Sequence, residues 1–316
     1  MKAYLLSGSD TQLRLINVEK PKPSAGEVLI EVQACGICHS DCHIINGSGA
    51  AWVQRPRILG HEVAGKVVAL GDGAPEDLLG KSVAVALVPP ATAIGLDFDG
   101  GYAEFAAAPV HTLVPLPANV SFEQAAVATD AVLTAYHAVV SEAGIDASTT
   151  VAVIGLGGLG SIGLRVAALQ GARVFGIDID KSKFEAALNN GAESCFTNLS
   201  MAKDVTFDVI VDFVGVTDTM AAALGVVRPR GRIVLVGLGS KELTIPSFPI
   251  VFKQVEIRGS LGGTKDELVT ALALISAGKL APVLEEVPFL SLNESFHRLE
   301  EGRVTGRLFT RPNRIE

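Results

Sequence analysis

The chain has 316 residues, of which 48% are hydrophobic and 19% are charged, and its formal net charge is −8. At ~150 residues per domain this length predicts two domains, and the hydrophobic content excludes a disordered chain. A negative chain without a basic run is not expected to bind nucleic acid. No apolar stretch reaches the ~20 residues of a membrane helix or has the pattern of a signal peptide, so we expect a cytoplasmic protein with no membrane partner.

The first part of the chain has a strand-like pattern. Residues 27–36, 62–70 and 81–88 are apolar runs separated by glycine, proline and aspartate turns. They predict a β-rich, mainly antiparallel domain or barrel. From Ser121 the pattern changes to helical spacing, and the predicted helix ends at Gly144, a typical C-cap residue. We expect this helix to connect two domains.

The middle of the chain alternates strand and helix patterns from about residue 149 to residue 260. Such an alternation predicts a parallel sheet with right-handed crossovers, here a doubly wound sheet of six strands. The last segment contains two amphipathic helices and two short strands that we expect to rejoin the first domain. The predicted fold class is therefore α/β, with a β-rich domain at 1–128, a Rossmann domain at 129–263 and a return segment at 264–316.

A glycine-rich turn follows the first strand of the predicted Rossmann domain and opens a helix. In this GxGxxG motif the first glycine permits a tight turn, the second lets the backbone approach a pyrophosphate, and the third lets helix and strand pack closely. The context of strand, turn and helix makes a chance match improbable. The residues predicted to contact the cofactor here are Gly155, Gly157, Gly158, Leu159 and Gly160.

An acidic residue ends the next predicted strand. Asp178 follows Gly160 by 18 positions, where a carboxylate can accept hydrogen bonds from the adenosine ribose. The same negative charge repels a 2′-phosphate. The sequence therefore predicts NAD rather than NADP as the cofactor.

Three of the four cysteines lie close together, at Cys35, Cys38 and Cys42, and the fourth is Cys195. This spacing argues against a disulfide framework. A CxxC pair can be a redox dithiol, but here histidines surround it, and His61 follows in a Gly-His-Glu triplet. Cysteine and histidine together are typical zinc ligands.

At this point the chain resembles the zinc-containing medium-chain alcohol dehydrogenases. The resemblance rests on the segments CGICHSDCH, LGHEVAGKVVALG, GGYAEF and GLGGLG, which occur in the family's order along the whole chain. The Gly-His-Glu triplet separates zinc members from the zinc-free quinone and enoyl reductases of the same superfamily. The resemblance implies a GroES-like catalytic domain followed by the Rossmann domain.

The resemblance implies a catalytic zinc held by Cys38, His61 and Asp130. Asp130 lies on the predicted connecting helix, where many members have a cysteine and some secondary-alcohol enzymes have an aspartate. An oxygen ligand donates less charge than a thiolate, so the zinc would be a stronger Lewis acid. Glu62 would be the neighbouring carboxylate that can approach the metal, and Asp41 would orient His61.

Further roles are implied by the same resemblance. Ser40 and His43 match a relay that carries the substrate proton to the surface, although ordinary loop hydrogen bonding is the alternative. Three basic residues match positions near the cofactor and could equally be solvated surface groups. Trp52 lies where relatives line the substrate pocket, although a lone tryptophan is often packed core. The three basic residues are His39, Lys183 and Arg307.

The chain departs from the family in one segment. Most zinc members carry a second, structural zinc on a lobe with four cysteines, and residues 89–100 occupy this interval here without any cysteine. We therefore expect one zinc per chain and no structural zinc. Loss of the lobe leaves the assembly open between homodimer and homotetramer, with the last Rossmann strand at about 256–260 able to pair across a two-fold axis.

The expected activity is reversible hydride transfer between NAD and a primary or secondary alcohol, giving an aldehyde or ketone. Two alternatives stay open. A zinc-free quinone or enoyl reductase would use NADPH and would lack Cys38, His61 and Asp178. A non-catalytic NAD-binding protein would show decay of the three ligands, which are all present.

Overall fold

The computed structural model describes residues 1–87 and 92–314. Contacts divide the chain into two compact units, one formed by Met1–Leu133 with Gly263–Glu316 and the other by Thr134–Gly262. The boundaries expected from the sequence lie after residues 128 and 263. The first boundary found from contacts lies after Leu133, so Asp130 belongs to the first unit. In the described ranges, no helix is long and apolar enough to cross a membrane.

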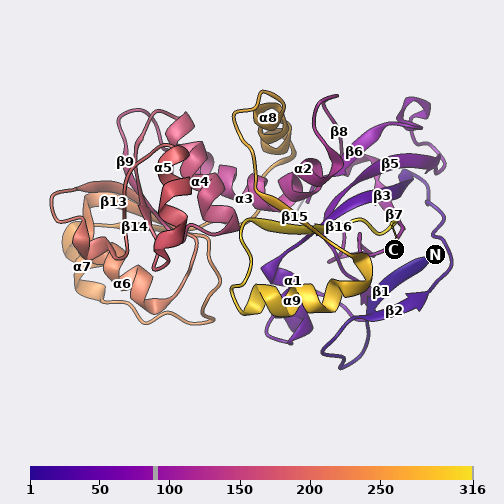
Figure 1. Ribbon diagram of the computed structural model, residues 1–316, viewed down its shortest axis with the longest axis horizontal. Helices are drawn as coiled ribbons and strands as arrows, with labels where there is room; N and C mark the ends of the chain where they lie inside the picture. The colour runs from indigo at the N-terminus through magenta and orange to yellow at the C-terminus, as the bar shows by residue number, and fades with distance from the viewer. Residues whose placement is uncertain (88–91, 315–316) are drawn as a thin grey trace. The chain divides into compact units, whose positions relative to one another are not determined.

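The first unit is built on two β-sheets (Figure 1). Strands β2, β1 and β4 form a three-stranded antiparallel sheet, and a seven-stranded sheet has the order β15-β16-β3-β5-β6-β8, with β7 also paired to β3. Among the described strand pairs of this unit, β15–β16 is parallel and the others are antiparallel. The strands are β1 (Lys2–Leu6), β2 (Arg14–Asn17), β3 (Glu27–Ile37), β4 (Arg57–Ile58), β5 (Glu62–Leu70), β6 (Ser82–Val85), β7 (Phe105–Pro109), β8 (Leu113–Pro115), β15 (Leu284–Val287) and β16 (Arg307–Thr310).

Strand β3 is the centre of the larger sheet. It pairs with β5 along one edge, and with β7 and then β16 along the other. Val28, Ile30 and Val32 are completely buried, as expected for a central strand whose apolar side chains meet the core. Strands β15 and β16 of the last segment belong to this sheet.

Short helices complete the first unit. The helix α1 follows β3 directly, and the return segment contributes α8, capped by Thr264 and Glu267 in a capping box, and α9. Single 3₁₀ turns occur at η1, η2, η3 and η8. The bounds are α1 (His39–Ile45), η1 (Ala50–Trp52), η2 (Glu76–Leu78), η3 (Val110–Thr112), α8 (Lys265–Ser276), η8 (Phe289–Ser291) and α9 (Leu292–Glu300).

The predicted helix from Ser121 to Gly144 is present but irregular. It consists of α2 (Phe122–Val127), a π-helical segment η4 (Ala128–Val132), α3 (Leu133–His137) and a second π-helical segment η5 (Ala138–Glu142). Gly144 follows with a φ of +63°, the left-handed conformation expected of a glycine after a helix. The π segments are a finding that periodicity did not predict, and such bulges often mark functional sites.

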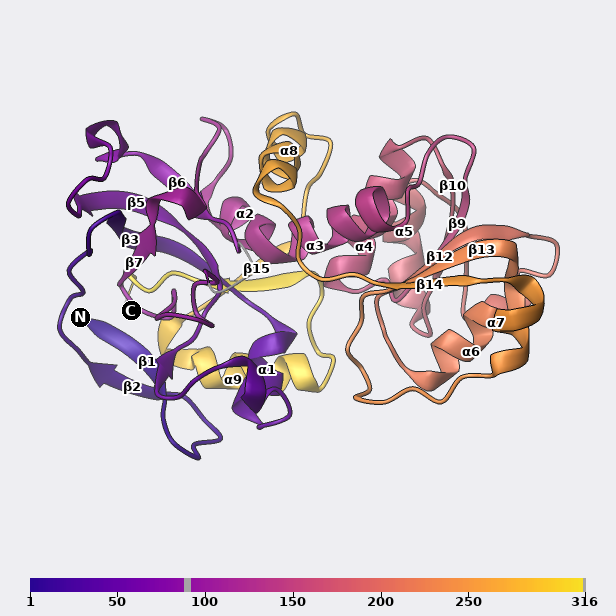
Figure 2. The same cartoon turned by 180° about the vertical axis from the view of Figure 1, so that it is seen from behind.

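The second unit is a doubly wound α/β domain. Its sheet has the order β11-β10-β9-β12-β13-β14 with every neighbouring pair parallel, so the order reverses at β9. Helices α4 and α5 cover one face, and α6 and α7 cover the other (Figure 2). The elements are β9 (Thr150–Ile154), α4 (Gly158–Leu169), β10 (Arg173–Ile177), η6 (Lys181–Lys183), α5 (Phe184–Asn189), β11 (Ala192–Phe196), η7 (Leu199–Met201), β12 (Phe207–Asp212), α6 (Thr217–Val226), β13 (Val227–Leu235), α7 (Ser247–Lys253) and β14 (Glu256–Gly259).

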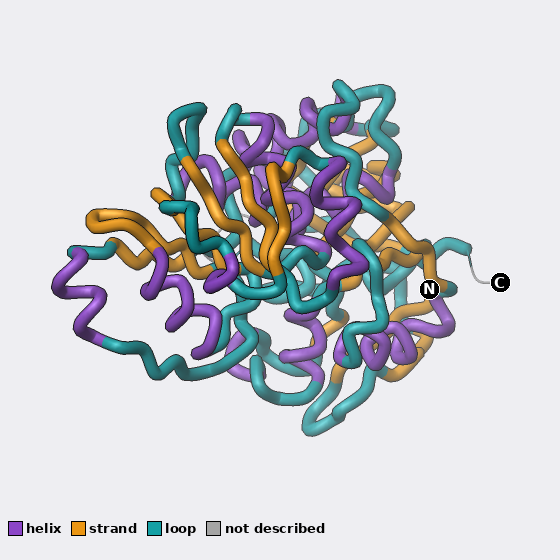
Figure 3. Tube along the Cα trace, turned by 60° about the vertical axis from the view of Figure 1, so that its left-hand side comes forward, coloured by secondary structure: helices purple, strands orange, loops and turns teal. Residues whose placement is uncertain are grey.

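The six-stranded sheet confirms the predicted fold class. The number of strands is the one predicted. The sequence pattern is weakest at β11, a half-exposed edge strand that contains a glutamate and a serine. Figure 3 distinguishes the helices, strands and connecting loops along the trace. In a doubly wound sheet, ligands bind at the carboxyl ends of the strands where the order reverses, which here is the end of β9.

Candidate metal centre and dinucleotide site

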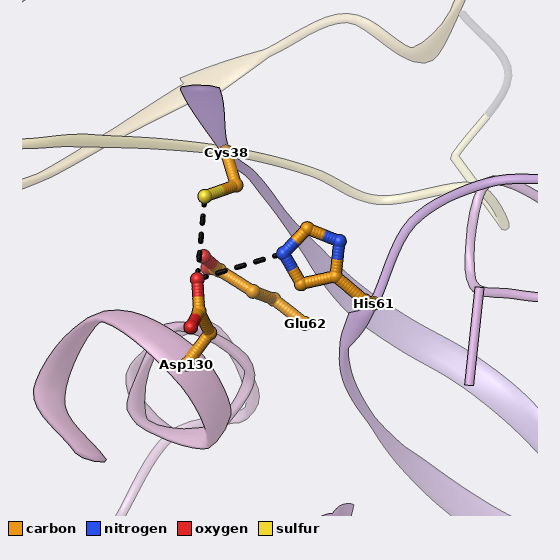
Figure 4. A group of neighbouring side chains, drawn as sticks. All are labelled: Cys38, His61, Glu62 and Asp130. Carbon is orange, nitrogen blue, oxygen red and sulfur yellow. Dashed lines mark hydrogen bonds and ion pairs between the residues drawn. The ribbon is translucent and has the colours of Figure 1, made fainter. Parts of the chain in front are cut away.

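Four potential metal ligands meet in the first unit. The ligand atoms of Cys38, His61, Glu62 and Asp130 all lie within 4.8 Å of one another. Asp130 Oδ2 is 3.2 Å from Cys38 Sγ and 3.5 Å from His61 Nε2. Figure 4 marks both contacts with dashed lines. The structure thus brings together the three residues that the sequence assigned to zinc, from positions 38, 61 and 130.

Strand register explains how Cys38 and His61 meet. In the antiparallel β3–β5 pair, Gly36 lies opposite Glu62, so the end of β3 adjoins the beginning of β5. Cys38 follows the last residue of β3, and His61 precedes the first residue of β5. Two ligands distant in sequence are therefore placed side by side by backbone hydrogen bonds.

Gly60 is required by the same geometry. Its φ is +94°, and a Cβ at this position would lie 2.7 Å from the backbone nitrogen of Tyr102. A side chain would be strained in conformation and would also collide with backbone that cannot move cheaply. The glycine before His61 thus fixes the approach of the histidine.

Asp130 is contributed by the π-helical segment η4. Burial by itself raises the pKa of Asp130, but the hydrogen bond and charge of His61 outweigh it and hold the pKa well below its usual range. For His61, burial lowers the pKa, and the charge of Asp41 more than reverses this, so the net shift is upward. The carboxylate is therefore ionised and close to the imidazole.

The donor set fits a zinc ion. It combines sulfur, imidazole nitrogen and carboxylate oxygen, which zinc accepts in catalytic sites with three protein ligands. Glu62 is completely buried, and among the described residues its Oε2 has no hydrogen-bond partner. Asp41, whose Oδ1 lies 3.4 Å from His61 Nδ1, is also completely buried. Such a concentration of buried carboxylates is stabilised by a cation.

Glu62 forms a buried ion pair with Arg307 of β16. Burial raises the pKa of Glu62 above its usual range, and the Arg307 guanidinium opposes this shift. The resemblance placed Arg307 near the cofactor, and the structure places it in the first unit with only 6% of its surface exposed. It is therefore not a solvated surface charge, and its contact with a cofactor stays a prediction.

The residues assigned to the proton relay lie on α1. Ser40 Oγ is 3.3 Å from His61 Nε2, and His43, three positions further along the helix, has its Nδ1 3.0 Å from Ser48 Oγ. Residues three apart lie on the same side of a helix. Ser40 therefore lies beside His61, and His43 lies about one turn further along the same side of α1. Both side chains are half-buried.

Two further predicted residues lie near this helix. Trp52 is 46% exposed, and its ring meets His43 edge to face at a centroid distance of 6.1 Å. It is therefore not packed core. His39 is the first residue of α1, and its side chain is only partly exposed. The buried part of the ring, and then the charge of His43, lower its pKa.

The glycine-rich turn of the second unit has the geometry that its sequence predicts. Gly155 has a φ of +83° directly after β9, and α4 begins at Gly158. A Cβ on Gly160 would lie 1.6 Å from the carbonyl oxygen of Gly155, whereas a Cβ on Gly157 would meet nothing within 4 Å. Gly160 is thus needed for packing, and Gly157 leaves open space beside the helix N-terminus.

Asp178 lies at the end of β10 and supports this turn. Its Oδ2 accepts hydrogen bonds from the backbone N–H of Leu156 at 2.7 Å and from Lys183 Nζ at 2.9 Å. Its Oδ1 accepts one from the backbone N–H of Asp180 at 2.9 Å. Lys183 is therefore paired with Asp178. Each carboxylate oxygen has more than one acceptor direction, so these bonds leave capacity for a ribose hydroxyl.

Sequence reasoning missed a buried carboxylate at the same edge of the sheet. Asp212 ends β12, and its oxygens accept hydrogen bonds from the N–H groups of Val214 and Gly215 and from the hydroxyl of Thr219. The loop that it holds packs against the glycine-rich turn, because Val214 lies beside Gly155. The available signal was an aspartate directly after the apolar run Val-Ile-Val.

Comparisons with known proteins agree with this architecture. Residues 24–118 match the family described as alcohol dehydrogenase GroES-like domain, and residues 158–277 match zinc-binding dehydrogenase. An alcohol dehydrogenase from Geobacillus stearothermophilus is 32% identical, with 98% of each chain covered.

Solved structures show the same similarity over the whole length. The acetophenone reductase from Geotrichum candidum in complex with NAD has a TM-score of 0.92 at 32% identity, covering 99% of this chain and 98% of that one. The cobalt- and zinc-bound alcohol dehydrogenase from Pyrobaculum aerophilum has a TM-score of 0.89 at 27% identity, covering 99% of both chains. The chain therefore belongs to the zinc-containing medium-chain alcohol dehydrogenase family.

Proposed function

We propose that this protein is a zinc-assisted, NAD-dependent dehydrogenase that interconverts secondary alcohols and ketones. The observation that carries this proposal is the meeting of Cys38, His61 and Asp130 in a chain that also has a doubly wound sheet with a GxGxxG turn. The family membership and the NAD complex of the Geotrichum neighbour support the same reading.

Cys38, His61 and Asp130 would hold one zinc ion, and Glu62 is the carboxylate next to them. A zinc ion with three protein ligands supplies a Lewis acid, which lowers the pKa of a hydroxyl group and polarises a carbonyl. We propose a single ion per chain. The sequence has no cysteine in the interval 89–100, of which residues 89–91 lie outside the described part of the chain.

The chain's own groups perform the remaining tasks. Ser40 can take the proton of a substrate hydroxyl at the metal centre as it gives up its own, and the imidazole of His43 can carry a proton on towards solvent. In the second unit, the backbone N–H groups at the start of α4 can bind the pyrophosphate, and Asp178 can accept a ribose hydroxyl.

Two observations favour a ketone or secondary alcohol as the substrate. The third ligand is an oxygen of Asp130, which the family resemblance associates with secondary-alcohol enzymes. One neighbour is named an acetophenone reductase, and reduction of that ketone gives a secondary alcohol. Trp52, half-exposed beside His43, is proposed to line the pocket for the organic group.

A matched panel of alcohols tests this function. Purified protein should form NADH with 2-propanol and 1-phenylethanol, and more slowly with 1-propanol. Reduction of quinones or enones by NADPH without alcohol oxidation would instead favour the zinc-free reductase. Tight NAD binding with no turnover of any alcohol would favour a non-catalytic NAD-binding protein.

Asp178→Ser should change the cofactor preference. Because serine removes the charge that repels a 2′-phosphate, the ratio of kcat/KM for NAD over NADP should fall at least ~10-fold, or ~1.4 kcal/mol. Steady-state kinetics with both cofactors measure the ratio. Asp180→Ser, which changes an exposed carboxylate two residues away, is the control. An unchanged ratio in Asp178→Ser would refute the assigned role.

We also propose that two copies of the chain associate through the edge of the Rossmann sheet. Strand β14 is the last in the sheet order and has a free edge in the described chain. The helix before it, α7, exposes Phe248 and Phe252, at 74% and 81% of their surfaces. An antiparallel pair of β14 strands around a two-fold axis would bring two such apolar patches into one interface.

Replacing both phenylalanines by aspartate should weaken this assembly. The dimer dissociation constant of Phe248→Asp/Phe252→Asp should rise on the order of 10-fold or more, because buried aromatic anchors dominate interface energies. Analytical ultracentrifugation measures this dissociation constant. Leu188→Asp, an exposed leucine of α5, is the control and should associate normally. If the double variant dimerises as tightly as the natural sequence, the proposed interface is wrong.

A further inference from the structure

Tyr102 has no role in the proposed chemistry, yet its hydroxyl lies within the metal centre's supporting network. The side chain is completely buried, and the hydroxyl donates a hydrogen bond to Asp41 Oδ2 at 2.7 Å. The hydroxyl also lies 3.3 Å from the carbonyl oxygen of Gly36. A neutral residue thus supplies a short, well-placed donor to a buried carboxylate.

Asp41 in turn touches the elements that carry two of the proposed ligands. Its Oδ2 also accepts a hydrogen bond from the backbone N–H of Cys38 at 3.3 Å. Its Oδ1 lies 3.4 Å from His61 Nδ1, and neither of these two atoms has any other partner in the described chain. Because Asp41 is completely buried, these contacts decide where its carboxylate can lie.

The Tyr102 ring is itself held firmly. The backbone N–H of Tyr102 donates a hydrogen bond to the carbonyl oxygen of Leu59 at 3.0 Å. Its ring packs edge to face on the ring of Phe296, with the two centroids 6.0 Å apart. Gly60, the residue before His61, lies so close that a Cβ there would be 2.8 Å from a Tyr102 ring carbon. The ring therefore cannot move away without disturbing the segment that carries His61, and its hydroxyl stays within hydrogen-bond distance of Asp41 Oδ2.

From this chain of contacts we propose that Tyr102 is a positioning residue for the metal centre. Its hydroxyl fixes the Asp41 carboxylate, which then accepts the Nδ1 proton of His61 and leaves Nε2 free to bind the ion. The inference rests on the proposed zinc site and extends it by one residue. It assigns to the tyrosine of the GGYAEF segment a task that the sequence motif alone did not suggest.

The test is the zinc affinity of Tyr102→Phe, measured by competition with a coloured chelator. The zinc dissociation constant should rise about 10- to 100-fold, the range for loss of a partner that orients a metal-binding histidine. Tyr4→Phe is the matched control, because Tyr4 is also buried in the first unit but donates to the carbonyl oxygen of Leu290. Its zinc affinity should not change.

Two further measurements separate positioning from general stability. Asp41→Asn should weaken zinc binding, and adding Tyr102→Phe to it should have little further effect, because both changes act through the same carboxylate. The visible spectrum of the Co²⁺-substituted protein should shift in Tyr102→Phe and not in Tyr4→Phe, since it reports the ligand field at the metal.

The outcomes distinguish this inference from the proposed function. If the unaltered protein binds zinc but Tyr102→Phe binds it equally well, or if the two changes add fully, the positioning role is refuted. A lower unfolding temperature of metal-free Tyr102→Phe with unchanged zinc affinity and cobalt spectrum would also refute it. Failure of the unaltered protein to bind zinc would refute the proposed zinc site itself.

Discussion

Replacing Cys38 by alanine is expected to remove the bound zinc and to lower kcat/KM by at least ~10³-fold. The thiol is one of three proposed ligands, and its Sγ lies 3.2 Å from the Asp130 carboxylate. With only two ligands the Lewis acid is lost, and metal-ion catalysis contributes several kcal/mol, each ~1.4 kcal/mol corresponding to tenfold in rate. Elemental analysis and NAD-linked alcohol oxidation measure the two effects.

Cys42→Ala is the matched control for this change. Cys42 belongs to the same sequence motif and to α1, but its Sγ lies near the carbonyl oxygen of Phe296 and not among the proposed metal ligands. Burial raises the pKa of this thiol well above its usual range, so it remains protonated. Cys42→Ala should keep its zinc. Undiminished zinc content and activity in Cys38→Ala would contradict the assignment.

Gly160→Ala and Gly157→Ala should both weaken NAD binding, but only Gly160→Ala should also destabilise the fold, although the two variants change the same motif. The new methyl group in Gly160→Ala would collide with the Gly155 carbonyl oxygen at 1.6 Å, so the turn must open. We expect a loss of at least ~2 kcal/mol in the free energy of unfolding, together with loss of NAD binding. The free energy follows from urea unfolding.

In Gly157→Ala the methyl group would project into open space, and the residue's φ of −77° suits alanine. Stability should therefore change by less than ~0.5 kcal/mol. NAD affinity should still fall at least ~10-fold, because the methyl group occupies the approach of the pyrophosphate to the backbone. Titration with NAD measures the affinity. If Gly157→Ala binds NAD normally, the pyrophosphate does not lie on this turn.

Much of the fold was predictable because its signals are local. The apolar runs that became β3 and β5, the glycine turn after β9 and the strand and helix alternation each lie within a few consecutive residues. Strand β11 has the weakest sequence pattern of the six, because an edge strand buries few side chains. The π-helical segment around Asp130 was missed because it changes hydrogen bonding without changing composition.

The site was predictable only in part, since its ligands are brought together by long-range contacts. The family resemblance, rather than spacing, paired Cys38 with His61 and Asp130. The ion pair between Glu62 and Arg307 and the bond from Tyr102 to Asp41 join residues distant in sequence, and no local pattern indicates either one. These contacts depend on the register of β3 with β5 and β16, which becomes known only with the folded chain.

The most direct test of the whole account is the zinc content of the purified protein, measured together with its NAD-linked oxidation of a secondary alcohol before and after chelation. We predict about one zinc per chain, with activity that disappears when the metal is removed and returns when zinc is added back. Two zinc ions per chain, or alcohol oxidation that continues unchanged in the metal-free protein, would contradict the account.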